Sequence, residues 1–242
     1  MKADIVKRLL ELNRRFYTDF GPSFSATRSR IQPGVRRILD LIEGDETLLD
    51  LGCGNGGLAR ALAKNGHRAA YLGLDFSLPL LSDAGSLPLG FPAVFWEVDL
   101  AQLPVIGHQL SINSEPFSVI TAFAVLHHIP GQRLRQQILA SVHELLAPGG
   151  RYIHSNWQFL NSPRLRKRIR PWREIGLAQE DVDRGDYLLD WRAGGRGLRY
   201  VHHFDERELT RLAASTGFEI AQTFYSDGKE GNLALYQIWG KI

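Results

Sequence analysis

The sequence predicts an α/β fold in which a seven-stranded sheet is covered by helices on both faces. Short apolar runs alternate with helical patterns between residues 48 and 157, which is typical of a parallel sheet. The first run, Leu48–Leu51, leads through a glycine turn into a helical pattern. Two further strand patterns, at 218–225 and 233–240, flank a turn-rich loop and predict a C-terminal antiparallel hairpin.

Composition limits the class of protein. At 242 residues, the chain has the length of a single domain with a substantial core. Its one cysteine, Cys53, excludes an intrachain disulfide and a cysteine-based zinc site, and fits a reducing compartment. Residues 1–20 are amphipathic, and no run reaches the ~18 apolar residues of a membrane span. We therefore expect a cytoplasmic protein without a secretory signal and without membrane contact.

We divide the domain into four segments. Residues 1–44 form a helical cover, with one helix from Ile5 to Phe20 that ends at Gly21-Pro22 and a second that begins at Pro33. This cover either caps the sheet or contributes to the active site. The other segments are a cofactor-binding core at 45–157, a basic insertion on the substrate side at 158–198 and a C-terminal helix and hairpin at 199–242. The insertion fits no regular alternation of strands and helices.

The core begins with the strand at 48–51 and the helix at 58–63. Later strands are predicted at 68–75, 93–98, 117–123 and 151–157, and a long helix at 132–146. Pro148-Gly149-Gly150 separates this helix from the fifth strand. In the last segment, Asp205 with Glu208 three residues later is the pattern of a capped helix start. Ligands of such sheets bind at the carboxyl ends of the strands.

The glycine turn fits two patterns. Gly52, Gly54 and Gly57 match the dinucleotide pattern G-x-G-x-x-G, whereas Gly52, Gly54 and Gly56 match the tighter G-x-G-x-G. Asp50 favours the second pattern, because an acid repels a pyrophosphate and suits the ammonium group of S-adenosylmethionine. The turn therefore resembles motif I of class I methyltransferases. A dehydrogenase and a turn without a ligand are the alternatives.

Acids also close the next two predicted strands. Asp75 is placed to accept both ribose hydroxyls of a nucleoside, which fits NAD equally well. The resemblance implies that Asp99 holds the adenine amino group, although a strand-end acid can also simply cap the following helix. The predicted residues of the cofactor site are Asp50, Gly52, Cys53, Gly54, Asn55, Gly56, Asp75, Phe76, Ser77, Asp99, Leu100, Phe123 and Ala124.

Two adjacent histidines, His127 and His128, follow the fourth strand. Neighbouring residues seldom face the same ion, and no matching ligand cluster accompanies them, so we predict no metal site. One histidine is expected to touch substrate or cofactor while the other packs. A histidine base would matter only if the acceptor were a hydroxyl or an amine.

A basic stretch occupies Arg164–Arg173. The whole chain has 29 basic and 26 acidic residues, so this cluster is a local feature. It is either a solvated surface or a site for RNA, in which phosphates contact the basic residues and aromatic rings stack on bases. The predicted substrate-binding residues are Arg164, Arg166, Lys167, Arg168, Arg170, Trp172 and Trp191.

Several segments together resemble the tRNA wobble-uridine carboxymethyl methyltransferases, a family with the class I (Rossmann-like) fold. They are FSATR at 24–28, DLGCGNG at 50–56, AVLHH at 124–128, GDYLLDW at 185–191 and RYVHHF at 199–204. The chain departs from the family pattern at Asp190, Val201 and Leu233. The resemblance implies S-adenosylmethionine as cofactor, tRNA rather than DNA as partner, and a small zinc-binding activator protein.

In this family the acceptor is a carboxylate, which is ionised near pH 7 and needs no general base. The catalytic residues that we predict on this basis are Arg28, His127, His128, Arg199, Tyr200 and His202. Arg28 and Arg199 would grip the uridine carboxylate, although Arg28 could instead form a salt bridge in the cover. Tyr200, His202 and Trp191 would shape the base pocket. A small-molecule methyltransferase and a non-catalytic cofactor-binding scaffold are the alternative functions.

Overall fold

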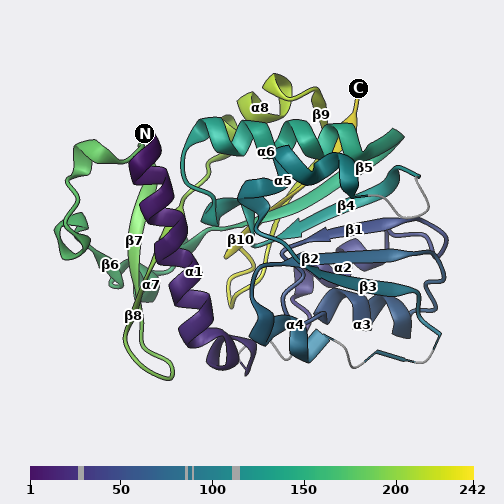
Figure 1. The fold of residues 1–242 in the computed structure, drawn as a ribbon, viewed down its shortest axis with the longest axis horizontal. Coiled ribbons are helices and arrows are strands. Elements are labelled where there is room, and N and C mark those ends of the chain that lie inside the picture. Colours follow the sequence, from purple (N-terminus) through teal and green to yellow (C-terminus); the bar gives the residue numbers. More distant parts are fainter. Residues whose placement is uncertain (27–29, 85–86, 89, 111–114) are drawn as a thin grey trace.

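The structure, a computed structural model, describes residues 1–26, 30–84, 87–88, 90–110 and 115–242. Figure 1 shows a central sheet with helices around it and a small second sheet at its side. The α-helices are α1 (Ala3–Ala26), α2 (Pro33–Leu39), α3 (Gly57–Lys64), α4 (Leu78–Ala84), α5 (Leu103–Ile106), α6 (Gln132–Leu145), α7 (Pro163–Arg166) and α8 (Glu206–Ser215). The strands are β1 (Leu48–Leu51), β2 (Tyr71–Asp75), β3 (Ala93–Glu97), β4 (Phe117–Phe123), β5 (Leu146–Trp157), β6 (Ile169–Arg170), β7 (Asp186–Trp191), β8 (Gly197–His202), β9 (Phe218–Ser226) and β10 (Ala234–Lys241).

The central sheet has seven strands in the order β3-β2-β1-β4-β5-β10-β9. Strands β1 to β5 are parallel, and β10 pairs antiparallel with both β5 and β9. The predicted α/β class and C-terminal hairpin are therefore confirmed. The direction of strand succession reverses between β1 and β4, which places a crevice at the carboxyl ends of these two strands.

Helices cover both faces of the central sheet, as predicted. On one face, Leu139 of α6 and Leu212 of α8 pack into an apolar cluster with strands β1, β2 and β4. On the other face, Ile38 of α2 and Leu62 of α3 pack against β1, β2 and β10. Figure 1 shows α5, α6 and α8 above the sheet and α3 and α4 below it.

The prediction that the first helix ends at Gly21-Pro22 is wrong, because α1 continues to Ala26. Proline lacks the amide hydrogen of a helical bond and normally ends a helix. Here the helix end packs on α4, and a Cβ at Gly21 would lie within 4 Å of Ser77, Pro79 and Leu80. Tertiary packing of this kind routinely overrides local propensity.

Strand β5 also begins earlier than predicted, at Leu146 rather than Arg151. Its glycines lie inside the strand, where Gly149 has a φ of 73°. The pairing with β4 shifts register between Phe117 and Val119, so the part of β5 between Leu146 and Arg151 forms a bulge.

The insertion at 158–198 has regular structure that its sequence pattern did not indicate. Strands β6, β7 and β8 form a three-stranded antiparallel sheet that continues past residue 198. Helix α1 lies between this small sheet and the central sheet (Figure 1). Ile5 and Leu9 of α1 form a buried cluster with Trp172, Leu188 and Tyr200. Among the described residues, no helix combines the length and the apolar character required to cross a membrane.

Helix α2 is held at its start by the loop between β9 and β10. The Gly34 amide donates to Asp227 Oδ1 at 2.9 Å, and the Tyr236 hydroxyl donates to Asp227 Oδ2 at 2.7 Å. A Cβ at Gly34 would lie 2.3 Å from the Tyr236 ring. Only glycine lets the helix approach this ring so closely.

Gly34→Ala should therefore destabilise the fold. Overpacking costs roughly 1–3 kcal/mol, which exceeds the ~1 kcal/mol that alanine contributes as a helix former. We expect a lower free energy of unfolding in urea. Gly44→Ala is the control, because its Cβ would meet nothing closer than 3.7 Å. Equal free energies of unfolding for the two variants would contradict this account of the packing.

Candidate active site

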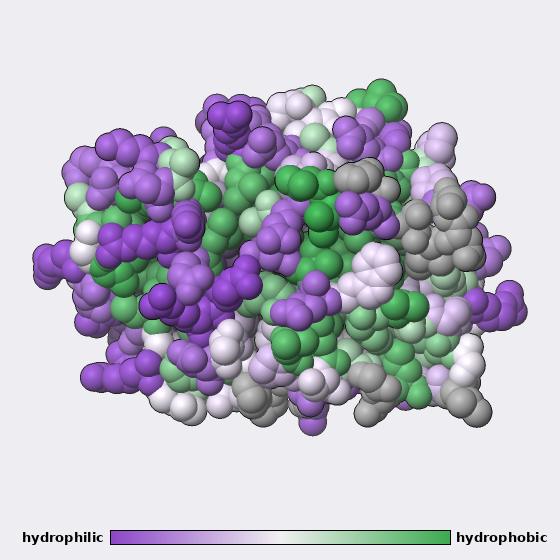
Figure 2. All heavy atoms as spheres, in the orientation of Figure 1, coloured by the Kyte–Doolittle hydropathy of each residue, from purple (hydrophilic) through white to green (hydrophobic). Residues whose placement is uncertain are grey.

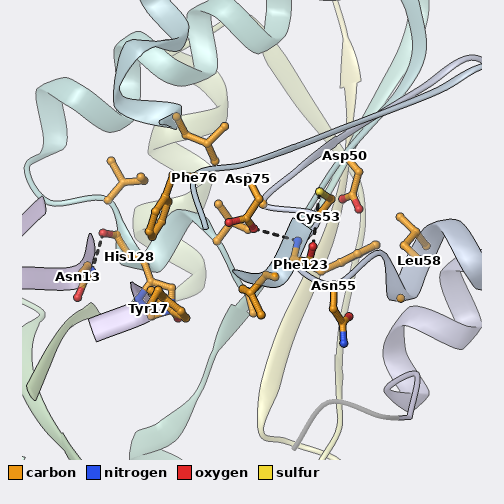
Figure 3. A pocket seen from close by; sticks show the side chains of 18 of the residues that line it. Asn13, Tyr17, Asp50, Cys53, Asn55, Leu58, Asp75, Phe76, Phe123 and His128 are labelled. Atoms are coloured by element: carbon orange, nitrogen blue, oxygen red, sulfur yellow. Dashed lines mark hydrogen bonds between the residues drawn. The ribbon is translucent and has the colours of Figure 1, made fainter. Parts of the chain in front are cut away.

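A pocket opens at the carboxyl ends of β1, β2 and β4, where the switch in strand order places it. Figure 3 shows Asp50, Asp75 and Phe123 from these strand ends on one side and Asn13 and Tyr17 of α1 on the other. Residues 30–32 and Val35 also line the pocket. The N-terminal cover therefore does more than cap the sheet, since it forms one wall of the pocket.

The backbone of the glycine turn distinguishes the two glycine patterns. Gly52, Gly54 and Gly56 have φ of 70°, 54° and 71°, whereas Gly57 is the first residue of α3. A Cβ at Gly52 would lie 2.4 Å from Val125, but one at Gly54 would meet nothing within 4 Å. The geometry fits the tighter G-x-G-x-G pattern, with open space for a ligand beside Gly54.

Asp50 is a buried carboxylate of the pocket, and its side chain is fixed by two hydroxyl groups. Tyr71 donates to Oδ2 at 2.6 Å and Thr121 donates to Oδ1 at 2.7 Å. Burial raises the pKa of Asp50 from 3.8 to about 6, although these two hydrogen bonds lower it. The two hydrogen bonds thus fix Asp50 where it can meet a positively charged group, and burial of its negative charge lowers the stability of the fold.

Asp75 joins the second strand to the glycine turn. Its Oδ2 accepts from the Gly54 amide and its Oδ1 from the Ser77 amide, both at 2.9 Å. Burial raises its pKa, while the backbone donors oppose that shift. Each oxygen keeps a second lone pair, so the carboxylate can also accept from a pair of ligand hydroxyls.

Asp99 caps the following helix, which is one of the two roles considered for it. Its Oδ1 accepts from the Ala101 amide at 2.9 Å and caps a short 3₁₀-helix, Leu100–Gln102. It also lines the pocket and forms an ion pair with Arg14 of α1. Arg14 lies over the Phe76 ring, so α1 is fastened across the mouth of the pocket.

Most predicted residues of the cofactor site lie in the pocket wall. Gly56 and Ser77 do not, since Gly56 caps α3 and Ser77 supports Asp75. The sequence prediction missed Asn13 and Tyr17. Their spacing from Leu9 places them on the apolar face of α1, and an asparagine on such a face was the available signal.

The structure separates the two histidines. His128 lines the pocket, with Nε2 hydrogen-bonded to the Tyr17 hydroxyl at 2.9 Å and Nδ1 3.2 Å from the Tyr200 carbonyl. His127 is 1% exposed, and its Nδ1 accepts from the Trp157 amide. His128 is therefore the one that can meet a ligand. Among the described residues, no three His, Cys, Asp or Glu side chains group as metal ligands do.

Of the described residues predicted for catalysis or substrate binding, His128 alone lines the pocket. Tyr200 and His202 are 0% and 1% exposed and belong to a buried polar network, so they do not shape a base pocket. Trp172 is 6% exposed in the cluster under α1 and cannot stack on a base there. All three corrections have a similar cause, because these side chains pack under α1 or into the buried network rather than toward the pocket.

Arg199 lies behind the pocket wall. Its guanidinium is surrounded by three aromatic rings at 4.9 to 5.6 Å: Trp157 (4.9 Å), Phe16 (5.3 Å) and Trp191 (5.6 Å). The Phe16 ring also contacts Tyr17, which lines the pocket. Arg28 lies outside the described residues.

The basic stretch forms α7 and β6 at the edge of the insertion. Arg170 pairs with Glu174 at 2.6 Å. Within the described part of the chain, the five other basic side chains of this stretch have no acidic partner: Arg164, Arg166, Lys167, Arg168 and Arg173. Figure 2 shows a largely hydrophilic surface over the side of the molecule that carries the small sheet.

Comparison with known families identifies the class of protein. The model of the methyltransferase domain family matches residues 24–223, so the chain belongs to this family. A protein of Encephalitozoon cuniculi whose name describes it as a methyltransferase is 27% identical over 85% of this chain and 86% of its own length.

Two other relatives carry more specific names. The tRNA (carboxymethyluridine(34)-5-O)-methyltransferase of Arabidopsis thaliana is 29% identical over 59% of this chain, which spans only 32% of that protein. A ubiquinone biosynthesis O-methyltransferase of Histophilus somni is 31% identical over 54% of this chain and 52% of its own length.

Solved structures share the fold at low identity. A SAM-dependent methyltransferase of Methanosarcina mazei has a TM-score of 0.64 and 22% identity, over 88% of this chain and 98% of that one. Magnesium protoporphyrin IX methyltransferase of Synechocystis, solved with bound SAM, has a TM-score of 0.61 and 17% identity, over 96% and 97%. The class I methyltransferase fold predicted from the sequence is confirmed.

Asp50→Asn should stabilise the fold at neutral pH. Because its pKa is raised, Asp50 binds a proton more tightly in the folded protein than in the unfolded chain. The contribution of the protonated group to the free energy of unfolding is therefore lost as the pH rises from 3.8 to about 6. Above pH 6 the ionised group costs about 2–3 kcal/mol. Asparagine removes this cost and still bonds with Tyr71 and Thr121. We expect a higher free energy of unfolding than wild type at pH 7.5 and a similar one near pH 4. A variant less stable than wild type at pH 7.5 would contradict the cost assigned to Asp50.

Proposed function

We propose that this chain transfers a methyl group from S-adenosylmethionine to a carboxylate, and that the acceptor is a carboxymethyl-type wobble uridine in tRNA. The main support for this substrate is the similarity to the Arabidopsis wobble-uridine methyltransferase. The segments around Trp191 and Arg199, which lie within the small sheet, add to that similarity.

The pocket fits this methyl donor. Asp50 offers a fixed carboxylate to an ammonium group, Asp75 offers acceptors to a ribose diol, and the open space beside Gly54 admits a ligand against the backbone. Solved neighbours with the same fold contain SAM. When bound, the cofactor supplies a methyl group on a positively charged sulfur.

The residues of this chain then have to align the reactants. A carboxylate acceptor is already ionised at neutral pH, so no side chain needs to remove a proton. Alignment alone can supply roughly 7–11 kcal/mol of a barrier. The His128 ring, fixed by its hydrogen bond with Tyr17, would contact the acceptor. Arg199, behind the Phe16 ring, would attract the negative charge of the acceptor carboxylate. Arg28 keeps its proposed role in gripping the carboxylate.

The basic residues of α7 support an RNA substrate. Their charges have no acidic partner among the described residues, which leaves them available for phosphates. A ubiquinone-type O-methyltransferase is the second candidate, because relatives with that name match this chain as well. A hydroxyl acceptor would need a base, and His128 lies in the pocket for that role.

Incubation with labelled S-adenosylmethionine and total tRNA should place label on one nucleoside. We expect mass spectrometry to identify a methyl ester that mild alkali removes. Asp50→Asn is the control, because loss of the carboxylate that faces the cofactor ammonium should abolish labelling without unfolding the protein. Label found only in small molecules would overturn the tRNA proposal and favour the second candidate.

Loss of charge on α7 should weaken tRNA binding in a salt-dependent way. Each lost phosphate contact reduces the slope of log affinity against log salt by about 0.7–0.9, so a triple alanine variant of Arg164, Arg166 and Lys167 should lower it by roughly 2–3. The matched control removes three exposed arginines from α6 and α8, namely Arg133, Arg207 and Arg211. Equal slopes for the two variants, measured by filter binding, would exclude α7 from the interface.

A further inference from the structure

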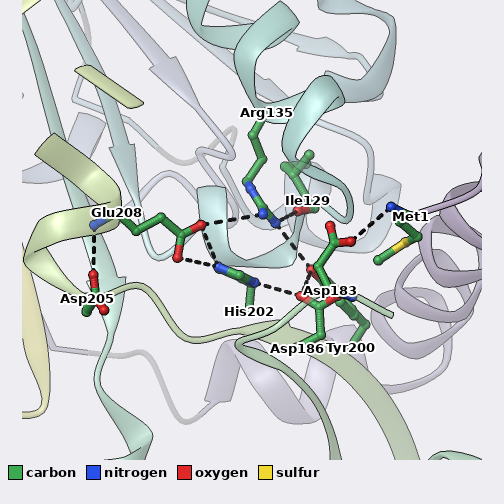
Figure 4. A network of polar contacts seen from close by, with 9 residues as sticks. All are labelled: Met1, Ile129, Arg135, Asp183, Asp186, Tyr200, His202, Asp205 and Glu208. Carbon is green, nitrogen blue, oxygen red and sulfur yellow. Dashed lines mark hydrogen bonds and ion pairs between the residues drawn. The ribbon is translucent and has the colours of Figure 1, made fainter. Parts of the chain in front are cut away.

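A buried polar network lies between the small sheet, α6 and α8, and no step of the proposed reaction uses it. Figure 4 shows Arg135 of α6, Asp186 of β7, His202 of β8 and Glu208 of α8 in one connected chain. His202 Nδ1 lies 2.6 Å from Asp186 Oδ1, and its Nε2 lies 3.0 Å from both Glu208 oxygens. The Tyr200 hydroxyl donates to Asp186 at 2.7 Å.

The charges in this network balance when His202 is protonated. Burial lowers the pKa of His202, but the hydrogen bonds with Asp186 and Glu208 outweigh that effect and raise it above its ordinary value. Two cations then face two carboxylates, since Arg135 lies 3.6 Å from Glu208. The other titratable groups beside His202 are Tyr200, which bonds to Asp186, and the adjacent His203, whose pKa burial lowers.

The network is directly bonded to the pocket wall. Arg135 donates to the Ile129 carbonyl at 3.0 Å, and the Tyr200 carbonyl lies 3.2 Å from His128 Nδ1. Asn13 donates to both the Tyr200 and the His128 carbonyls at 3.1 Å. Asn13, His128 and Ile129 all line the pocket, whereas Arg135, Asp186, His202 and Glu208 do not.

A buried ionic network is a poor source of stability, because desolvation offsets most of the attraction. Its best-attested use is to select one arrangement among several. Here it fixes the position of β8 relative to the segment that carries His128 and Ile129.

We infer that Arg135 and His202 are positioning residues, which through this network set the orientation of the His128–Ile129 wall of the methyl-transfer pocket. The inference rests on the proposed cofactor but not on the tRNA substrate. Cofactor affinity therefore tests it whatever the acceptor is.

The test compares two variants of the network with a matched control. Arg135→Lys keeps the charge but cannot reach both the Ile129 carbonyl and Glu208. Glu208→Gln removes one charge from the less buried end of the network. The control is Arg151→Lys, because Arg151 also donates to a carboxylate, Glu46, at 2.7 Å and to a backbone carbonyl, that of Leu41, at 3.1 Å.

Calorimetric titration with S-adenosylmethionine should show about tenfold weaker binding for the two network variants and wild-type binding for the control. The His128 ring resonances in NMR spectra should shift in the network variants alone. If Arg135→Lys does not fold, Glu208→Gln decides the outcome. Folded network variants with wild-type affinity and unshifted His128 resonances would overturn the inference.

The pH profile adds a readout that a purely structural role would not move. As pH rises through the pKa of His202, the wild-type network is left with one unbalanced negative charge, so cofactor affinity should fall. In Glu208→Gln, neutral His202 leaves Arg135 balanced by Asp186, and the alkaline fall should flatten. An unchanged alkaline fall in Glu208→Gln would contradict the role of His202.

Discussion

The arrangement of the pocket depends on one buried amide, the side chain of Asn13. Its Nδ2 donates to the carbonyls of Tyr200 and His128, and its Oδ1 accepts from the Tyr200 amide at 2.8 Å. Helix α1, the small sheet and the segment after β4 therefore meet at a single residue. The contact also satisfies the backbone of β8 on the edge that does not pair with β7, where buried polar groups without partners would be costly. The small sheet is thereby tied to the pocket rather than attached loosely to its side.

The buried carboxylates in the opposite wall of the pocket lower the stability of the fold. Asp50 and Asp75 are both buried in this wall. Burial of Asp50 raises its pKa above the ordinary value, and the negative charge of Asp75 raises it further. The hydroxyls of Tyr71 and Thr121 and the amides of the glycine turn offset only part of this cost. Charged groups held in an unfavourable place are typical of functional sites.

Local patterns predicted the central sheet, the glycine turn and the hairpin, because each depends on residues adjacent in sequence. The wall formed by α1 could not be predicted in this way, since Asn13 meets residues 128 and 200 only after folding. The prediction that Trp172 stacks on a base is wrong for a related reason. Leu165, Ile169 and Trp172 recur within it at spacings of four and three, and two of them, Leu165 and Trp172, are buried. The arginines of α7 are exposed, as a basic surface requires, whereas the buried apolar residues between them anchor the insertion.

The distribution of charge also constrains how an anionic acceptor can reach the pocket. Asp50, Asp75 and Asp99 line one side, and Arg14 neutralises only the last of these. An acceptor carboxylate would be repelled by the other two until a positively charged ligand occupies the space beside them. For such an acceptor the physical order of binding is cofactor first. The basic residues of α7 lie outside the pocket wall, where they can hold a polyanion without competing for the positively charged ligand that the carboxylates select.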